Sequence, residues 1–435
     1  MASPASEPTG QRRPEDVTAR PRRGPVTYPR PPLSEWNRRI EVLERAPVFF
    51  TLPPPTLRAI ARRMRPITST AGSVIVEQGE VIDSLLFIES GRAMLRVEQT
   101  PGHMTTVASL GPGEMFGESG LAGEPSPAAM VAAEDIRLLA LDRQSVNRML
   151  EREPDVVAGL HRLADQRRRT FPVLVSSAAA AGESQRADVI AVYSAKGGSG
   201  RTTIALNLAA ALARKYPGQV LLVDLALPFN HVALLANLVP SGSLARLAGT
   251  PSELLGDALL GAVVYHANGM LVLPGTLRAE ESDQLKPQNV HEALEILRPA
   301  FRYIILDLGT ALDDVTLAAL ENAARMILVT TPELTTLQGA SELMEILAVA
   351  LGITPESLTL VLNHRGPRSA VSRGAVERAI GRTVDVEIRH DGVKVEEAAL
   401  RGILSHEDPK SEIAVGARAI VEALETARPT PVEAR

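Results

Sequence analysis

The residues with the clearest capacity for chemistry lie at positions 195–203. They read Ala195, Lys196, Gly197, Gly198, Ser199, Gly200, Arg201, Thr202 and Thr203. Glycines let successive backbone N–H groups turn toward one anion, and the start of the next helix adds the positive end of its dipole. Arg201 brings a positive charge to this loop, and the hydroxyl of Thr202 stands where a phosphate loop binds Mg²⁺. These residues predict a site for a nucleotide phosphate and its metal ion.

The loop departs from the strict phosphate-loop pattern at two positions. Ala195 stands in place of the first glycine, and Arg201 stands in place of the phosphate-binding lysine. A simpler interpretation is therefore a glycine-rich turn between a strand and a helix.

Polar residues close three apolar strands further along the chain. They are Asp224 after Val-Leu-Leu-Val, Asp307 after Tyr-Ile-Ile-Leu, and Asn363 after Leu-Val-Leu. Asp307 is the acid expected to hold the Mg²⁺ shell together with Thr202. An aspartate at the end of a strand can also cap a helix. Two of them after a phosphate loop favour a nucleotide site.

The elements that must position these residues alternate along the second half of the chain. Apolar, β-branched strands such as DVIAVYS, QVLLVDL, YIILDLG and LTLVLNH are separated by amphipathic helices over residues 188–426. This alternation predicts a doubly wound, mostly parallel α/β sheet of the P-loop NTPase kind.

The motifs of this half resemble the ParA/MinD family of deviant P-loop ATPases. SAKGGSGRTT, VLLVDLALPFNH, YIILDLG and VLNHRG occur in the family order. The resemblance implies binding of ATP with Mg²⁺, an adenine contact by Asn363, and a homodimer formed on ATP binding, in which Lys196 reaches the partner's nucleotide. The family carries a second acid two residues after Asp224, where this chain has Ala226. A methyl group neither accepts a proton nor orients water, so we expect hydrolysis to be slow or absent.

Within that family, the sequence looks most like the CpaE/TadZ group of Tad/Flp pilus assembly. That resemblance implies a localisation factor that docks the protein partners of a pilus or positioning system. Members of the group normally carry a receiver-like domain in front, which this chain lacks. The last helix, before ARPTPVEAR, has no basic amphipathic face for lipid.

The front of the chain has a different pattern. Short strands at close spacing, separated by Gly and Pro-Gly turns between residues 66 and 141, predict a small β-barrel or jelly roll with flanking helices over residues 34–170. EQGE, LLFIESGRAMLRV and GPGEMFGESGLAG resemble a cyclic-nucleotide-binding domain.

The ligand motif of such domains is degenerate here. Phe116, Gly117 and Glu118 match the sugar-binding segment, so Glu118 either takes a ribose hydroxyl or braces the loop. Pro127 stands where the phosphate-pairing Arg belongs, and Met130 stands where the hydroxyl residue belongs. Proline has neither charge nor N–H for a phosphate. We expect no useful binding of cAMP or cGMP.

Composition bounds the remaining assignments. The chain has 435 residues, a net charge of −5 and no cysteine, which fits a cytoplasmic protein with no global basic field for nucleic acid. No transmembrane run is found, so any polar or membrane location would come through partners. We expect disordered tails over residues 1–33 and 427–435 and a linker over residues 171–187.

Three classes of function fit these observations. They are an ATP-dependent positioning factor, an ATPase regulated by a cyclic nucleotide, and a scaffold that binds no nucleotide. Arg201 keeps a positive charge at the phosphates, which argues against the scaffold. Ala226 and Pro127 argue against the regulated enzyme. The sequence therefore favours the positioning factor.

Overall fold

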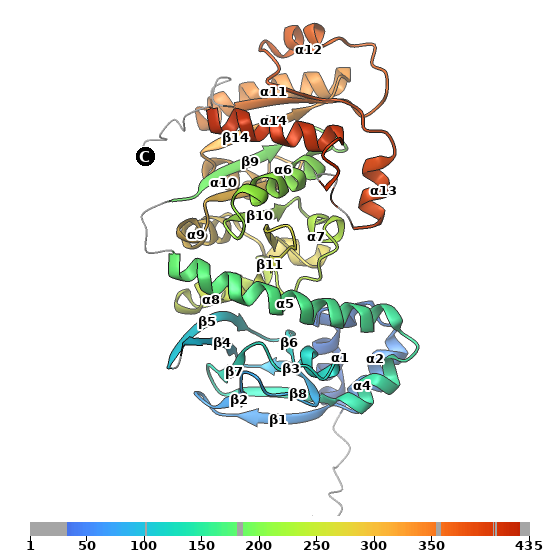
Figure 1. Cartoon of the computed structure of the whole chain (residues 1–435), viewed down its shortest axis with the longest axis vertical. Helices are drawn as coiled ribbons and strands as arrows, with labels where there is room; N and C mark the ends of the chain where they lie inside the picture. The colour runs from blue at the N-terminus through green and yellow to red at the C-terminus, as the bar shows by residue number, and fades with distance from the viewer. Residues whose placement is uncertain are drawn as a thin grey trace, which may run out of the picture.

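Two domains are stacked along the long axis of the molecule (Figure 1). The computed structural model describes residues 33–100, 102–180, 186–353, 358–402, 404 and 407–426. The predicted tail over residues 427–435 lies outside the described residues, as does nearly all of the tail predicted over residues 1–33.

The front domain is a β-sandwich with helices at one end. Its strands are β1 (Arg65–Ser69), β2 (Val74–Val76), β3 (Ser84–Ser90), β4 (Ala93–Thr100), β5 (His103–Leu110), β6 (Met115–Phe116), β7 (Ala129–Ala132) and β8 (Ile136–Asp142). They form two four-stranded sheets, in the orders β1-β8-β3-β6 and β2-β7-β4-β5. Its helices are α1 (Leu33–Arg45), α2 (Pro54–Ala61), α3 (Glu118–Leu121), α4 (Arg143–Leu150) and α5 (Pro154–Ala180). The predicted all-β front domain is confirmed.

The core of the sandwich follows from the side-chain alternation of its strands. Leu86 and Ile88 of β3, Leu95 of β4 and Met130 of β7 belong to one buried apolar cluster between the sheets. Alternate residues of a strand point to opposite faces, so each strand contributes every second side chain to this core.

Helix α5 corrects the predicted linker. It runs unbroken to Ala180 and carries Pro172 inside it, so most of residues 171–187 is helix. Phe171, Leu174 and Val175 are buried. Phe171 and Val175 join the core of the front sandwich, whereas Leu174 joins a core of the second domain. Pro172 and the small residues that follow Val175 suggest that a helix ends here, although Phe171, Leu174 and Val175 have helical spacing.

The second domain is a doubly wound α/β sheet, as predicted. Its strands are β9 (Asp188–Tyr193), β10 (Val220–Leu225), β11 (Val264–Tyr265), β12 (Leu271–Pro274), β13 (Tyr303–Leu308), β14 (Arg325–Thr330), β15 (Leu358–Asn363) and β16 (Val386–Ile388). Their order is β11-β12-β10-β13-β9-β14-β15-β16, parallel except for the antiparallel edge strand β11. The strands are buried on both faces, which is why they read as continuous apolar runs.

Helices cover both faces of this sheet. They are α6 (Arg201–Lys215), α7 (Val232–Leu235), α8 (Ser252–Ala262), α9 (Pro287–Leu297), α10 (Asp314–Glu321), α11 (Leu334–Leu351), α12 (Arg373–Ile380), α13 (Lys394–Leu400) and α14 (Glu412–Thr426). Helices α6, α7 and α14 pack on one core, and α8 to α12 pack on the other. Of the described helices, α11 alone has the length and hydropathy of a membrane span, and one of its faces is buried on the sheet.

The parallel register brings the predicted acids together. Asp224 of β10 lies opposite Asp307 of β13, and Asp307 lies opposite Val192 of β9. Strand β9 leads directly into the loop at residues 194–200. Ligand sites of open parallel sheets form at this carboxyl edge.

Candidate nucleotide-binding site

The loop between β9 and α6 has the backbone of a phosphate loop. Gly198 has φ +79° and Gly200 has φ +90°, and Gly200 is the N-cap of α6. Both angles are in the left-handed region, which residues with a Cβ rarely adopt. Nothing lies within 4 Å of the place where a Cβ on Gly197 would stand. The predicted strand–loop–helix context is therefore present.

Arg201 and Asp307 face one another beneath this loop. The Nε of Arg201 lies 3.4 Å from Oδ1 of Asp307, and the Asp307 side chain is fully buried. Among the described residues, Nε and Nη1 of Arg201, both carboxylate oxygens of Asp307 and the Ser199 hydroxyl are buried without a hydrogen-bond partner. Buried polar groups are seldom left so, and those at functional sites often await a ligand. The donors suit phosphate oxygens, and the carboxylate suits Mg²⁺.

Burial, and then the neighbouring Asp224 carboxylate, raise the pKa of Asp307 to about 7. The Arg201 guanidinium and the Thr202 side chain act in the opposite direction. Thr202 therefore stands close to Asp307, as a shared metal site requires. A divalent cation would relieve the repulsion between the two acids.

Asp224 holds the chain that follows β10. Its Oδ1 accepts a hydrogen bond from the Ala226 N–H at 3.2 Å, and its Oδ2 accepts one from the Val232 N–H at 2.8 Å. Asn230, which the sequence reasoning missed, donates from Nδ2 to the Asp224 carbonyl at 2.7 Å. Burial raises the pKa of Asp224. Its carboxylate braces the loop over residues 226–231, and its contact with a nucleotide stays a prediction.

Lys196 points away from the loop toward the start of α11. Its Nζ lies 3.0 Å from Oε2 of Glu333 and 2.9 Å from Oγ1 of Thr335. The lysine side chain is about half exposed, at 46%. An exposed ion pair of this kind is weak, so the lysine is free to leave it. Its role across a dimer stays a prediction.

Asn363 and Arg365 reach the loop from the end of β15. Asn363 donates from Nδ2 to the Ser199 carbonyl at 2.8 Å, and Arg365 donates to the Gly198 carbonyl. Asn363 therefore touches the phosphate loop, and its adenine contact stays a prediction. Arg365 lies in the motif VLNHRG, to which the sequence analysis assigned no role beyond that of Asn363.

In the front-domain pocket, Glu118 is paired with a residue of the same domain. Glu118 accepts hydrogen bonds from Nη1 of Arg167 at 2.9 Å to each of its carboxylate oxygens. Arg167 also donates to the Met115 carbonyl at 2.9 Å, and its guanidinium lies over the Phe116 ring. Met130 and Phe116 are buried in the sandwich core. Glu118 is thus a buried partner of α5.

Helix α8 and helix α5 close the space beside this pocket. A Cβ on Gly261 of α8 would stand 2.8 Å from the Cβ of Ala108 on β5, so the glycine permits direct contact. Gln166 accepts a hydrogen bond from the Val239 N–H, and Thr170 accepts one from the Tyr265 N–H. The cavity that remains has about 10 Å³. That is room for roughly one water and not for a nucleotide.

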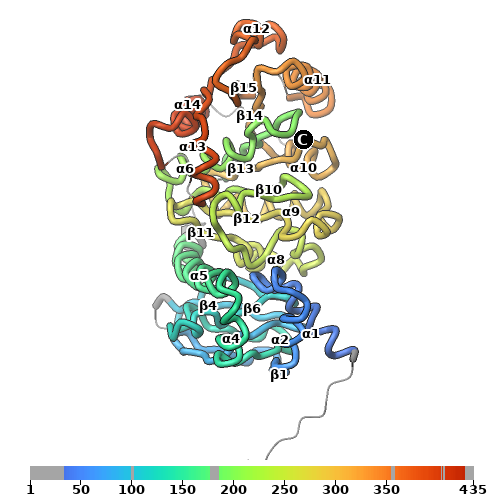
Figure 2. Tube along the Cα trace, turned by 90° about the vertical axis from the view of Figure 1, so that its right-hand side faces the viewer, coloured from blue at the N-terminus to red at the C-terminus, as the bar shows by residue number. Residues whose placement is uncertain are grey.

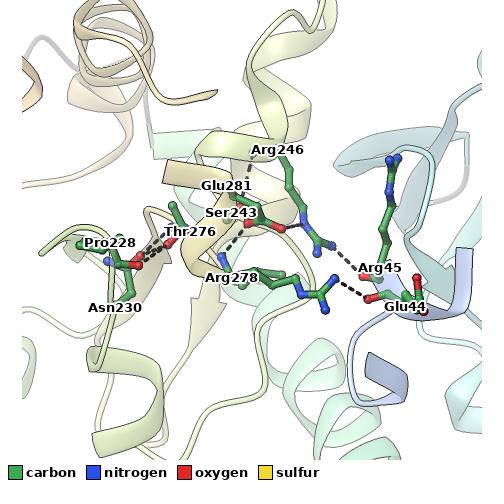
Figure 3. A network of polar contacts seen from close by, with 10 residues as sticks. Glu44, Arg45, Pro228, Asn230, Ser243, Arg246, Thr276, Arg278 and Glu281 are labelled. Atoms are coloured by element: carbon green, nitrogen blue, oxygen red, sulfur yellow. Dashed lines mark hydrogen bonds and ion pairs between the residues drawn. The ribbon is translucent and has the colours of Figure 1, made fainter. Parts of the chain in front are cut away.

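A polar network ties the two domains together at the end of α1 (Figure 3). Arg246 donates to the Arg45 carbonyl at 2.9 Å, and Arg278 donates to the Glu44 carbonyl at 3.3 Å. Cations at a helix carboxyl end are favourable because they face its negative dipole end. Glu281 accepts a hydrogen bond from Nε of Arg246 at 2.7 Å.

Residues 276–281 also contact the loop that Asp224 braces. Asn230 accepts a hydrogen bond from the Thr276 N–H at 2.8 Å, and Glu281 accepts one from the Leu277 N–H at 2.8 Å. Residues 276–281 therefore lie between the front domain and the loop that Asp224 braces (Figure 3). Figure 2 shows from the side how the front domain lies against the edge of the sheet that carries β11.

Comparisons with known proteins agree with both domains. Residues 67–153 match the family model of the cyclic nucleotide-binding domain, and residues 187–355 match that of an AAA domain. An uncharacterized ATP-binding protein of Methanocaldococcus jannaschii is 31% identical over 219 residues, which are 49% of this chain and 78% of that protein. The cyclic AMP receptor protein of Thermus thermophilus is 35% identical over 132 residues, which are 29% of this chain and 59% of that protein.

A solved structure extends the likeness of the second domain. The crystal structure of a ParA family ATPase from Chlorobium tepidum is 29% identical, with a TM-score of 0.50, and covers 56% of this chain and 99% of that one. Several other curated relatives are matched over only 36% to 63% of their own length. The chain belongs to the family of ParA/MinD-type P-loop proteins, and it carries a domain of the cyclic nucleotide-binding type in front of the P-loop domain.

Proposed function

We propose that this protein is an ATP-binding positioning factor that takes ATP with Mg²⁺ at the loop over residues 196–203. The observation that carries the proposal is a group of buried polar atoms of Ser199, Arg201 and Asp307 that have no hydrogen-bond partner, although Arg201 and Asp307 form an ion pair. When bound, Mg²⁺ would be held by Thr202 and Asp307 and would neutralise charge between the phosphates. The similarity to an archaeal ATP-binding protein supports this choice of ligand.

The same site supports slow hydrolysis or none. Ala226 is buried and its N–H is already bonded to Asp224. A methyl group at this position cannot take a proton from water. Losing a general base typically costs about 10²–10⁴ in rate. The nucleotide would then control the state of the protein by being bound, and not through rapid hydrolysis.

We further propose that ATP drives a homodimer in which each Lys196 reaches the partner's nucleotide. The weak exposed pair of Lys196 with Glu333 lets the lysine leave without a large loss. The dimer would dock protein partners of a Tad/Flp pilus or another positioning system in the cytoplasm. A polar or membrane location would come through those partners, and no specific nucleic acid is expected.

In this proposal the front domain is a docking module and not a receptor for cAMP or cGMP. Glu118 is already paired with Arg167, and Met130 fills the core. Pro127 brings no charge to a phosphate, and a buried phosphate without a counter-charge pays a large desolvation penalty. The match to the cyclic nucleotide-binding family favours the alternative, an ATPase that a cyclic nucleotide regulates. Calorimetry with both cyclic nucleotides on the full chain decides, because a micromolar or tighter dissociation constant would establish the alternative.

Titration of the full chain with ATP and Mg²⁺, followed by a measurement of mass in solution, tests the main proposal. We expect binding, a change from monomer to dimer, and turnover far below about 10 s⁻¹, the median for enzymes. Gly200→Val should abolish binding because of its φ of +90°. Absence of binding in the wild type would favour the nucleotide-free scaffold, and brisk turnover would contradict our interpretation of Ala226.

A further inference from the structure

We propose that Asn363 and Arg365 are positioning residues that hold the phosphate loop ready for its anion. They reach the loop from the end of β15 and bind two successive backbone carbonyls on it. The inference rests on the proposed function, since it names the residues that prepare the same site. It gives Arg365 its first role in the site and gives Asn363 a role on the loop.

Asn363 is the fixed member of the pair. It ends β15, it is 6% exposed, and its Nδ2 donates to the Ser199 carbonyl at 2.8 Å. A Cβ on Gly200 would stand 2.4 Å from this Nδ2. The glycine is therefore needed both for its backbone angle and for the approach of the amide. A side chain at position 200 would therefore displace the Asn363 amide from the loop.

Arg365 is the exposed and charged member. Its guanidinium donates from Nη1 to the Gly198 carbonyl, and a Cβ on Gly198 would stand 2.9 Å from Nη1. The arginine is exposed, at the end of a strand that also lies beside β14. Gly198, like Gly200, thus leaves room for a side chain that comes from outside the loop.

The peptide geometry turns these two contacts into a device for anion binding. In a trans peptide the C=O and the N–H of one unit point in opposite directions. Holding the Gly198 carbonyl directs the Ser199 N–H the other way, and holding the Ser199 carbonyl does the same for the Gly200 N–H. Side chains on one side thus set two donors on the other side, where a phosphate would lie.

Asn363 and Arg365 can hold the conformation of the loop while Arg201 is paired with Asp307. Arg201 does not contact the loop carbonyls that need fixing, so the support comes from β15. A loop that is already in its bound conformation binds more tightly because less freedom is lost on binding. Removing either support should therefore weaken the binding of phosphates, whatever base they carry.

The experiment measures the binding of Mg²⁺·ATP and of inorganic tripolyphosphate to the full chain by calorimetry. The variants are Asn363→Ala, Arg365→Ala and Arg365→Lys, and the control is Arg368→Ala. Arg368 is exposed in the same loop and makes no hydrogen bond to the phosphate loop in the part of the chain that the structure describes. It therefore matches the loss of charge without the loss of the contact.

We expect Asn363→Ala and Arg365→Ala each to weaken both ligands at least about tenfold, the effect of one charge-assisted hydrogen bond or its equivalent in ordering. Arg365→Lys should recover most of the loss, because an ammonium can also donate to the carbonyl. Arg368→Ala should change both affinities less than about threefold, as a distant screened charge does. Arg365 is exposed, so its variants test the proposal even if Asn363→Ala fails to fold.

Three results would overturn the proposal. Asn363→Ala could weaken ATP but leave tripolyphosphate unchanged, which would make Asn363 a reader of adenine alone. Arg365→Ala could change the two affinities no more than Arg368→Ala does, which would mean that Arg365 contributes only its positive charge and not its contact with the loop. The wild type could bind ATP but not tripolyphosphate, which would mean that the loop is not prepared for phosphates. A wild type that binds neither ligand would instead refute the proposed function.

Discussion

The pair of Glu118 and Arg167 gives the sharpest test of how the front domain is built. We predict that Arg167→Met destabilises this domain strongly. The methionine keeps much of the apolar stem but leaves the Glu118 carboxylate without its cation. The side chains of the pair are 1% and 6% exposed, so water cannot replace the lost partner.

The magnitude follows from burial. Breaking a buried ion pair by removing one partner costs about 3–5 kcal/mol, because it leaves an uncompensated buried charge. The Met115 carbonyl loses its donor as well. In the double variant Glu118→Gln, Arg167→Met no charge stays buried. We expect it to recover about 0.5–3 kcal/mol, which is the usual range of interaction energies between residues in direct contact.

The assay uses the fluorescence of Trp36, the one tryptophan of the chain. Trp36 packs against the core of the helices at the end of the front domain. Urea unfolding followed at this residue therefore reports on the front domain. Arg168→Met is the matched control. Arg168 neighbours Arg167 and pairs with Glu124, but the two side chains are 49% and 37% exposed.

An exposed pair contributes about 0–1 kcal/mol. We expect Arg168→Met to shift the urea midpoint little and Arg167→Met to shift it far more. Equal midpoints for the two variants would refute the reasoning, because they would show that losing the buried Glu118 pair costs no more stability than losing the surface pair. A double variant no more stable than Arg167→Met would refute the argument from unpaired charge.

Three further predictions concern the second domain. Because the pKa of Asp307 is raised from 3.8 to about 7, the folded protein retains a proton that the unfolded chain loses, and nucleotide-free stability falls as pH rises from about 4 to 7. Asp307→Asn should gain up to about 4 kcal/mol over the wild type at pH 8 but little near pH 4, and a constant difference across this range in denaturant titrations would contradict the shift. Lys196→Ala should bind ATP as a monomer but give no dimer by light scattering, and a dimer that forms normally would exclude the lysine from the interface. Ala226→Asp should raise phosphate release in a steady-state assay by up to about 10², while an unchanged rate would place the defect elsewhere, such as at Arg201.

Much of the second domain could be predicted from the sequence because its signals are local. The loop over residues 195–203 lies within nine neighbouring positions, and Asp224 and Asp307 each close a continuous apolar strand. A parallel sheet buried on both faces needs such runs, and it sets their carboxyl ends at one edge. The expected degeneracy of the front pocket also rests on local signals, since Pro127 and Met130 lie close to Glu118 in the chain, and it stays a prediction.

The sequence missed what depends on contacts between distant segments. Helix α5 was mistaken in part for a linker, because Pro172 and the small residues after Val175 suggest a break in the helix. Phe171, Leu174 and Val175 do have the i, i+3, i+4 spacing of a helix, but only the tertiary structure shows that Phe171 and Val175 face one domain and Leu174 faces the other. The ties through Arg246 and Arg278 to the end of α1 cross more than 200 residues and have no local signal.

The sequence by itself predicted the two domain types, the phosphate loop and the missing acid at Ala226, because each depends on motifs and patterns that can be followed along the chain without knowing which distant segments are in contact. Only the tertiary structure decided what those residues face. It paired Glu118 with Arg167, set Arg201 against Asp307, and brought Asn363 and Arg365 onto the loop. The physical reason is that a buried charge or carbonyl needs a partner wherever the fold can supply one. The fold supplies those partners from strands and helices that lie far away in the chain.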